Sequence, residues 1–411
     1  ALLRWGGEKD WSIDWSQLFG DGVASWQVDR SDFDHVLLEH AAEEGVDVRQ
    51  GAEVRSVRFV EDRPRGAEWV DAEGELHVAE FDVLVDASGR SGVLSAQHFR
   101  NRRRHEIFRN VAVWGYWTGG RTLPNTPSGG IDIISHPEGW YWVIPLRGGR
   151  HSVGFVTHRT NFQARRPAYP DNQAMLLDLV AESPTVTELL SDGAYEGKAH
   201  VEQDYSYVAD SFCGPGYYLV GDAACFLDPL LSTGVHLSLY SGMLAAAAIL
   251  ARGRGEVAER EAQAFYESLF RNAYARLLVL VCGVYEQYAG KESYFWLAQR
   301  MVRKQERSSQ QADASFTEVI SGLSDLHDAG TTGGAVALTE LIEEAQRAQE
   351  KLNDAEDVGG SGDSPVYLAP LRLSHATDLG DLYDAASGLY LVTTPRLGIG
   401  RDTPIRKGNI T

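Results

Sequence analysis

The residues best suited to chemistry lie in the stretch VGDAACFLDPLLSTG. Asp222 follows Gly221 at the end of an apolar run, where a carboxylate can accept hydrogen bonds from a ligand in the crevice beyond a strand. Thr233 and Gly234 open the next apolar stretch. A helix starting there would present unpaired N–H groups and a positive dipole end to an anion. Pro229 lies in the intervening loop. An ordinary strand–loop–helix connection with a Thr cap is the alternative.

A second stretch, GWYWVIPLRGG, concentrates aromatic side chains. Trp140 and Trp142 are two residues apart, so they would share one face of a strand. Pro145, which follows Ile144, would end that strand. The pattern is compatible with a half-buried strand of purely structural role and equally with two indoles that line a site.

Two further segments could contact a ligand. In FDVLVDASGRSGVL, a buried strand over Val83–Val85 would lead to Ala87 and Gly89, and Gly89 would let the backbone approach a ligand closely. Arg30 would stand just before a helix over residues 31–44. Taken alone, these features indicate only a Gly-containing turn and a solvated Arg.

Together the motifs resemble those of the flavin-dependent halogenases, a family with the FAD-dependent monooxygenase-like fold. The family's WxWxIP is matched by Trp140, Trp142, Ile144 and Pro145, and the resemblance extends from Arg4 to about Ala251. It implies an α/β protein with a Rossmann-like FAD-binding domain of the glutathione-reductase type, an antiparallel-sheet substrate domain and a helical C-terminal region. On the same resemblance, the FAD-binding residues are Arg30, Ala87, Gly89, Gly221, Asp222, Pro229 and Gly234.

The resemblance also implies a reaction. FADH2, supplied by a separate flavin reductase, would react with O2 to give a flavin hydroperoxide. Chloride or bromide, held at the N–H groups of the Ser232, Thr233 and Gly234 turn, would attack it and give hypohalous acid. A family Lys would then direct the hypohalous acid to an electron-rich aromatic ring. Trp140 and Trp142 would keep the site unsuited to direct oxygenation of the substrate. No metal is implied.

Two expected features of the family are missing. The phosphate-binding GxGxxG is absent, because GDGVAS (Gly20–Ser25) lacks a preceding strand, a following helix and the last Gly. The catalytic Lys would lie upstream of Ala1, and Lys9 stands on the wrong side of the matching segment, RWGG. We therefore expect a chain that lacks several tens of residues at its front. An inactive fragment stays an alternative.

The substrate class follows from a third departure. Leu231 occupies the position at which tryptophan halogenases carry Glu, which indicates a phenol- or pyrrole-type substrate, free or tethered to a carrier protein. The basic segment FRNRRRHEIFR (Phe99–Arg109) could dock an acidic carrier or be a solvated loop. His236 could be a base or a packed helix residue. An FAD-dependent aromatic hydroxylase or an isoprenoid reductase of the same fold is the alternative enzyme.

The elements around these motifs must position them. Ser31 or Asp32 would cap the helix after Arg30, Gly45 would end it, and a buried strand over Tyr217–Asp222 would precede a helix over Thr233–Ala251. Short strands with Gly and Pro turns over 111–156 are typical of an antiparallel sheet. The predicted units are the FAD-binding domain (1–104 and 201–259), the substrate domain (105–200), a helical region (260–350), and an acidic linker and tail (351–411).

The composition excludes some partners. The 411 residues include 38 Lys and Arg against 58 Asp and Glu, a net charge of −20, which argues against nucleic acid and anionic membranes. No apolar run reaches the ~18 residues that span a bilayer, and Leu239–Leu250 is typical of a buried helix. Cys213, Cys225 and Cys282 lack metal-ligand spacing and the density of a disulfide scaffold, which predicts a cytoplasmic protein.

Overall fold

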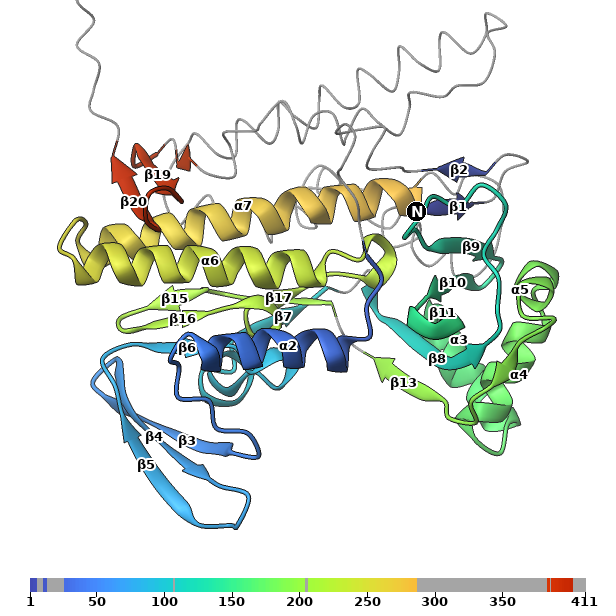
Figure 1. The fold of residues 1–411 in the computed structure, drawn as a ribbon, viewed down its shortest axis with the longest axis horizontal. Coiled ribbons are helices and arrows are strands. Elements are labelled where there is room, and N and C mark those ends of the chain that lie inside the picture. The colour runs from blue at the N-terminus through green and yellow to red at the C-terminus, as the bar shows by residue number, and fades with distance from the viewer. Residues whose placement is uncertain are drawn as a thin grey trace, which may run out of the picture.

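Figure 1 shows the computed structural model of the chain. It describes residues 1–5, 10–12, 26–105, 108–203, 206–286, 383–384 and 386–401. A large antiparallel sheet lies at one end, and the long helices α6 (Gly234–Gly253) and α7 (Glu259–Glu286) lie side by side over smaller sheets at the other. The GDGVAS stretch, Lys9 and most of the expected acidic linker fall outside the described residues.

The strands predicted between residues 111 and 156 form the large sheet, in the order β12-β8-β11-β10-β9-β1-β2, with β13 also paired to β8. Alternating apolar side chains let each strand contribute to a core on both faces. The bounds are β1 Leu2–Arg4, β2 Trp11–Ser12, β8 Asn110–Thr118, β9 Asp132–His136, β10 Gly139–Pro145, β11 Arg150–His158, β12 Ala194–Tyr195 and β13 His200–Gln203.

The two faces of this sheet pack against different partners. Tyr141 and Phe155 point to the face that three short helices cover, where Met175 and Leu179 complete the core. Trp140, on the other face, joins the larger core with α6 and α7. The covering helices are α3 Arg159–Arg165, α4 Asn172–Ala181 and α5 Pro184–Leu189. The aromatic strand therefore separates two cores.

The first strand joins the large sheet. β1 pairs in parallel with β9, Leu3 opposite Ile133, so it extends the large sheet although residues 1–104 were expected to belong to the FAD-binding unit. A strand of three residues is too short for its alternation to identify its neighbours, because pairing is set by contacts distant in sequence.

Two small sheets lie beneath α6 and α7. In the first, β6 and β16 run parallel, with β15 beyond β16; the second has the order β17-β14-β7. The predicted buried strand at Val83–Val85 forms one residue later, and Val85 is 41% exposed because β6 is an edge strand among the described residues. The bounds are β6 Leu84–Asp86, β15 Cys213–Gly214, β16 Tyr217–Leu219, β7 Arg102–Arg104, β14 Tyr207–Ala209 and β17 Cys225–Phe226.

Helix α6 is the helix predicted over Thr233–Ala251, with its start and end shifted slightly. By length and composition it is apolar enough to cross a bilayer, whereas no apolar run of that length was expected from the sequence. Leu237, Leu244 and Ala248 nevertheless lie fully in the protein core, and α7 packs along it. Its apolar character is therefore that of a core helix, as expected for Leu239–Leu250.

Helix α2 (Arg30–Glu43) differs from its predicted form at the N-terminus. Its cap is Asp29, whose carboxylate accepts from the Ser31 N–H, and not Ser31 or Asp32. None of its residues is buried, and the apolar Val36 and Leu37 are exposed. The segment after α2, in which the sequence alternates as in a strand and a hairpin, forms an antiparallel sheet of β3 Glu53–Val60, β4 Arg63–Val70 and β5 Leu76–Glu80.

The segment predicted as a tail contributes to the core. Strands β18 (Tyr383–Asp384), β19 (Leu389–Val392) and β20 (Gly398–Arg401) form an antiparallel sheet against α6. Leu389 and Ile399 are buried there, and Arg254, just after α6, donates to the Leu397 carbonyl at 2.8 Å.

Candidate functional site

The two predicted ligand-binding motifs meet at the ends of neighbouring parallel strands. Asp86 of β6 stands opposite Leu219 of β16, and the Val220 N–H donates to the Asp86 carbonyl at 3.0 Å. Parallel strands place their carboxyl ends at one edge of a sheet, which is where α/β proteins bind ligands. The loop with Ala87 and the turn at Gly221 therefore share this edge.

The buried Asp86 carboxylate holds the first loop from within. It accepts hydrogen bonds from the Ser88 N–H at 3.0 Å and from the Leu94 N–H at 2.7 Å. Ala87 remains exposed, and Gly89 begins a short 3₁₀ turn, Gly89–Ser91, at a φ of +62° that favours glycine. This arrangement leaves the outer side of the loop open to a ligand.

The second turn, Gly221–Ala223, requires its glycine. Gly221 has a φ of +54°, and a Cβ there would lie 2.6 Å from the Ser238 Oγ of α6. Its N–H donates to the buried Ser241 Oγ at 2.9 Å. The backbone at the strand end thus packs closely against side chains of α6, and this close approach fixes the position of the neighbouring Asp222.

Asp222 places an ionisable carboxyl group at the shared end of β6 and β16. Burial raises the pKa of its carboxyl group, and the guanidinium groups of Arg30, Arg90 and Arg102 act in the opposite direction. Among the described residues, none donates a hydrogen bond to this carboxylate. It is therefore available to a hydroxyl of a ligand.

Arg102 was not identified as a site residue from the sequence, yet it joins the two loops. Its Nη2 donates to the carbonyl of Gly89 at 3.0 Å and to that of Asp222 at 3.0 Å, and its Nη1 donates to the Arg90 carbonyl. The guanidinium also lies over the Tyr207 ring, 4.3 Å from its centroid. The basic segment expected to be solvated or to dock a carrier therefore turns one Arg inward.

Arg30 begins helix α2 instead of standing before it. Its guanidinium pairs with Asp34 one turn along at 2.9 Å and is largely exposed. Its positive charge partly offsets the rise in the pKa of Asp222, and the resemblance gives Arg30 a role in contacting FAD. That role stays a prediction.

The Ser-Thr-Gly turn forms at the start of α6, as predicted. Asp228 caps a 3₁₀ turn, Pro229–Leu231, by accepting from the Leu230 N–H at 3.0 Å. Ser232 then adopts a left-handed conformation (φ +54°), which is uncommon for a residue with a side chain.

The N-terminus of α6 is free of a side-chain cap. Thr233 is the N-cap residue, but its hydroxyl makes no capping hydrogen bond. The first N–H groups of the helix therefore stay available to an anion. A Cβ on Gly234 would lie 3.2 Å from the Phe226 ring, so the backbone approaches its neighbour closely there.

The aromatic strand forms as predicted, with Pro145 as the last residue of β10 and Ile144 half-buried beside it. Trp140 is fully buried, Trp142 is half-buried, and their rings are 6.0 Å apart. The Trp142 Nε1 donates to the Ser152 Oγ at 3.1 Å. Trp114 of β8, which the sequence did not single out, lies 6.2 Å from Trp142.

A buried acid connects this strand to the Ser-Thr-Gly turn. The Tyr285 hydroxyl accepts from the Trp140 Nε1 at 2.9 Å and donates to the Asp228 Oδ1 at 3.0 Å. Asn110 donates to the Asp228 Oδ2 at 3.1 Å. Burial raises the pKa of Asp228 to about 6, although the donors from Leu230, Asn110 and Tyr285 lower it in part.

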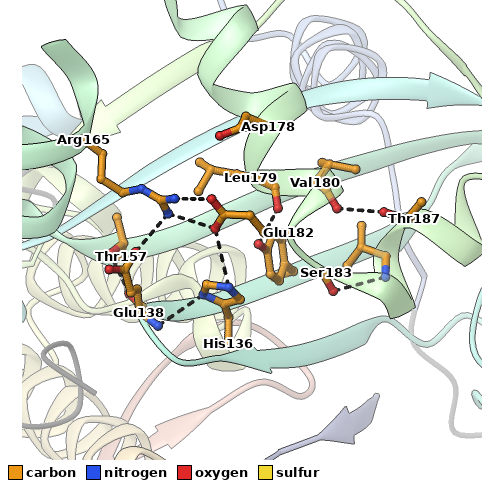
Figure 2. Close-up of polar contacts among 12 residues, drawn as sticks. His136, Glu138, Thr157, Arg165, Asp178, Leu179, Val180, Glu182, Ser183 and Thr187 are labelled. Atoms are coloured by element: carbon orange, nitrogen blue, oxygen red, sulfur yellow. Dashed lines mark hydrogen bonds and ion pairs between the residues drawn. The ribbon is translucent and has the colours of Figure 1, made fainter. Parts of the chain in front are cut away.

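A second polar cluster lies on the opposite face of the sheet. Figure 2 shows Arg165 of α3 between Glu138 and Glu182, with His136 of β9 beside Glu182. The Arg165 Nη1 is 2.9 Å from the Glu138 carboxylate and 3.0 Å from that of Glu182. Every acid here is paired, so the cluster fastens α3 and α4 to the sheet and offers no site for a ligand.

Hydrogen bonds connect the segments that carry the predicted site residues. The ends of β6 and β16 are paired, Gly221 bonds Ser241 of α6, and Tyr285 links Trp140 to Asp228, just before the Ser-Thr-Gly turn. His236 is exposed at the first turn of α6 and stacks on Tyr240. The sequence also has a set of aromatic residues after Arg260 that could line a pocket or pack in the core. Of these, Tyr274 and Tyr285 are buried, and Tyr288, Tyr294, Phe295 and Trp296 lie outside the described residues.

Comparison with known proteins identifies the class of the fold and its site. The model of the tryptophan halogenase family matches residues 16–324. A tryptophan 2-halogenase of Chondromyces crocatus is 36% identical over 431 residues, covering 98% of this chain and 80% of that protein. The flavin-dependent halogenase armH3 of Armillaria mellea is 37% identical over 325 residues, covering 74% of this chain and 63% of that protein.

Solved structures agree with the sequence matches. The myxobacterial chondrochloren halogenase CndH, described as a new variant of FAD-dependent halogenases, superposes with a TM-score of 0.69 at 30% identity, covering 93% of this chain and 82% of that one. The flavin-dependent halogenase CmlS superposes with a TM-score of 0.65 at 28% identity, covering 77% and 59%. The fold and site thus define an FAD-dependent enzyme. The chain belongs to the tryptophan halogenase family of flavin-dependent halogenases.

The described residues fit FAD. Gly89 and Gly221 allow backbone approach at the shared strand edge, where Ala87 is exposed. The Asp222 carboxylate can accept from the sugar-alcohol chain of the cofactor, and the start of α6 favours negative charge.

Proposed function

We propose that this chain uses reduced FAD, O2 and a halide to form hypohalous acid, which halogenates an electron-rich aromatic ring. The observation that carries the proposal is the uncapped N-terminus of α6, which follows left-handed Ser232 and shares a core with Trp140. When bound, FADH2 supplies the two electrons that reduce O2 so that the halide can be oxidised. A separate flavin reductase supplies FADH2.

The halide binds at the start of α6. The N–H groups of Thr233 and Gly234 are the donors, and the helix dipole adds to the attraction. The close approach of Phe226 to Gly234 makes this end of the helix partly apolar, which weakens competition from water. Chloride and bromide both suit such a site.

The cofactor is held by residues of α2, of the loops after β6, β16 and β17, and of the start of α6. Arg30, Gly89 and Asp222 contact FAD at the β6–β16 edge, and Ala87, Gly221, Pro229 and Gly234 provide close backbone approach. Support comes from the positive φ of Gly89 and Gly221 and from the charges around Asp222. Trp140 and Trp142 exclude direct oxygenation by filling the space beside the site with rigid indoles.

The substrate is a phenol- or pyrrole-type ring, free or tethered to a carrier protein. Half-buried Leu231, where tryptophan halogenases carry Glu, offers no carboxylate for an amino-acid substrate. The named relatives include both a tryptophan 2-halogenase and a chondrochloren halogenase, so the substrate has to be measured. We place the enzyme in the cytoplasm, in keeping with the free thiols of Cys213 and Cys225.

The test uses the full chain with FAD, a flavin reductase, O2 and bromide, and traps hypohalous acid with a simple halogen acceptor. Gly234→Pro removes one proposed halide donor at a position where helices accept Pro. Gly234→Ala is the matched control, because it adds a Cβ beside Phe226 but keeps the N–H. We expect the bromide KM of the Pro variant to exceed that of the Ala variant by about tenfold or more, with equal FAD affinity. FADH2 oxidation without bromide-dependent trapping by the unmodified chain would overturn the proposal.

A further inference from the structure

Asp228 is a fully buried carboxylate whose three partners come from its own loop, α7 and β8, and whose network reaches β10 through Tyr285. Its Oδ1 accepts from the Leu230 N–H and from the Tyr285 hydroxyl, each at 3.0 Å. Its Oδ2 accepts from the Asn110 amide at 3.1 Å. Through Tyr285 the network continues to the Trp140 Nε1. Loop, β8, α7 and β10 thus meet at one acid.

The geometry of this network is rigid. The Tyr285 ring packs in tilted contact with Phe108 at 5.7 Å and edge-on to Trp5 at 6.3 Å, so its hydroxyl has little freedom to move. Trp140 and Asp228 are 1% and 2% exposed. A link made of such groups fixes the relative positions of the segments it joins, because none of its members can turn without leaving a buried polar atom unpaired.

The acid also controls the turn that follows it. Its carboxylate caps the 3₁₀ turn Pro229–Leu231, and the Ser232 N–H then donates to the Pro229 carbonyl at 3.0 Å. Ser232 enters its left-handed conformation directly after this turn, and Thr233, the N-cap residue of α6 without a side-chain capping bond, comes next. Any shift of Asp228 would therefore displace the N–H groups at the start of the helix.

Holding a loop with a buried carboxylate lowers the folding free energy that is gained. Taking its charge out of water is unfavourable, and apolar residues of similar size often stabilise a core at least as well. A purely structural explanation does not account for linking the acid to the indole of Trp140 and to the Ser-Thr-Gly turn at once.

We propose that Asp228 is a positioning residue that, through Tyr285, locks the Ser232–Gly234 turn to the Trp140 strand. The halide donors and the tryptophan pair then keep one fixed spacing. The inference rests on the proposed function of that turn, and it adds a specific dependence: halide affinity requires the Tyr285 hydroxyl, although Tyr285 itself contacts no halide.

The central variant is Tyr285→Phe, which removes both hydrogen bonds of the hydroxyl and keeps the ring between Trp5 and Phe108. Tyr274→Phe is the matched control, because Tyr274 is a buried Tyr of the same helix whose hydroxyl bonds His105 instead. Asp228→Asn keeps the size of the side chain and removes its charge.

Two measurements decide the outcome. With FAD, flavin reductase and O2, we expect Tyr285→Phe to raise the bromide KM about threefold to tenfold, the loss of one or two hydrogen bonds, with kcat at saturating bromide and FAD affinity unchanged. Asp228→Asn should raise the bromide KM at least as far. In cofactor-free protein, the circular-dichroism couplet of the two adjacent indoles should weaken in Tyr285→Phe and stay intact in Tyr274→Phe.

Each result has a clear meaning. An unchanged bromide KM and an unchanged couplet in Tyr285→Phe would overturn the proposal, as would equal changes in Tyr274→Phe. If the unmodified chain makes no bromide-dependent product, the proposed function fails. The couplet, measured without cofactor, then still decides whether the Asp228–Tyr285 link holds Trp140.

Discussion

Gly154 lies directly beneath the indole of Trp142. The two residues stand opposite each other on β11 and β10, and a Cβ on Gly154 would lie only 2.2 Å from the Trp142 Cζ2. The missing side chain lets the indole lie across the neighbouring strand toward Trp114. The orientation of one proposed site tryptophan is therefore set by a glycine on another strand.

We predict that Gly154→Ala forces Trp142 out of this orientation. The clash involves a large ring and not a flexible chain end, so unfolding free energy should fall by about 1–3 kcal/mol. Denaturant unfolding checks the stability, and the indole circular-dichroism couplet checks the orientation. Gly242→Ala in α6, where a Cβ meets nothing within 4 Å, is the control and should be neutral or stabilising. Equal stability of the two variants would contradict the prediction.

We predict that Arg102→Lys weakens FAD binding. An ammonium group cannot bond the carbonyls of Gly89, Arg90 and Asp222 together as the planar guanidinium does. The two loops that we propose bind FAD should separate and the dissociation constant of FAD should rise about tenfold or more, measured by quenching of flavin fluorescence. Arg103→Lys is the control, since Arg103 is exposed on the same strand and pairs with Asp210. The prediction is wrong if both variants bind FAD alike.

The sequence predicts well what is local. The alternation around Trp140, the hairpin of β4 and β5, and the helix start after Thr233 each depend on the side chains of one short segment. The motif residues could also be placed at the ends of elements. Gly221 and Gly234 are both found where a Cβ would meet a neighbour, as close backbone approach requires.

The sequence does not predict partners that only the fold brings together. Asp228 and Tyr285 are 57 positions apart, and Arg102 meets Asp222 across 120. Nothing local distinguishes Arg102 from Arg103 beside it, because which one points inward depends on which face of the β17-β14-β7 sheet packs against the loops with Gly89 and Asp222. Buried polar networks of this kind need tertiary contacts to be recognised.

Gly221→Ala should disrupt the strand end that carries Asp222. Two costs add there: a φ of +54° that a side chain disfavours, and a Cβ 2.6 Å from the Ser238 Oγ. Gly255→Ala measures the backbone cost alone, because Gly255 has a φ of +73° and a Cβ there would meet nothing within 4 Å. We expect thermal unfolding to show a cost of about 1 kcal/mol at Gly255 and a larger cost at Gly221, accompanied by weaker FAD binding only at Gly221. A smaller loss of stability at Gly221 than at Gly255 would refute this.

His105 should make the stability depend on pH. Burial lowers the pKa of His105 to about 4, and the neutral ring is hydrogen-bonded to Tyr274. The unfolded chain, with an ordinary pKa of 6.5 for this group, binds a proton first as pH falls, so the stabilisation is complete above pH 6.5 and is lost progressively down to pH 4. The linkage amounts to at most about 3 kcal/mol. Denaturant unfolding between pH 7 and pH 4 measures it, and His105→Gln should flatten the profile by that amount. The remaining slope would come from His151, His158 and His200, whose pKa values burial also lowers, and, with the opposite sign, from Asp132, Asp222 and Asp228, whose pKa values burial raises. A variant profile as steep as that of the unmodified chain would show that His105 titrates freely in the folded state.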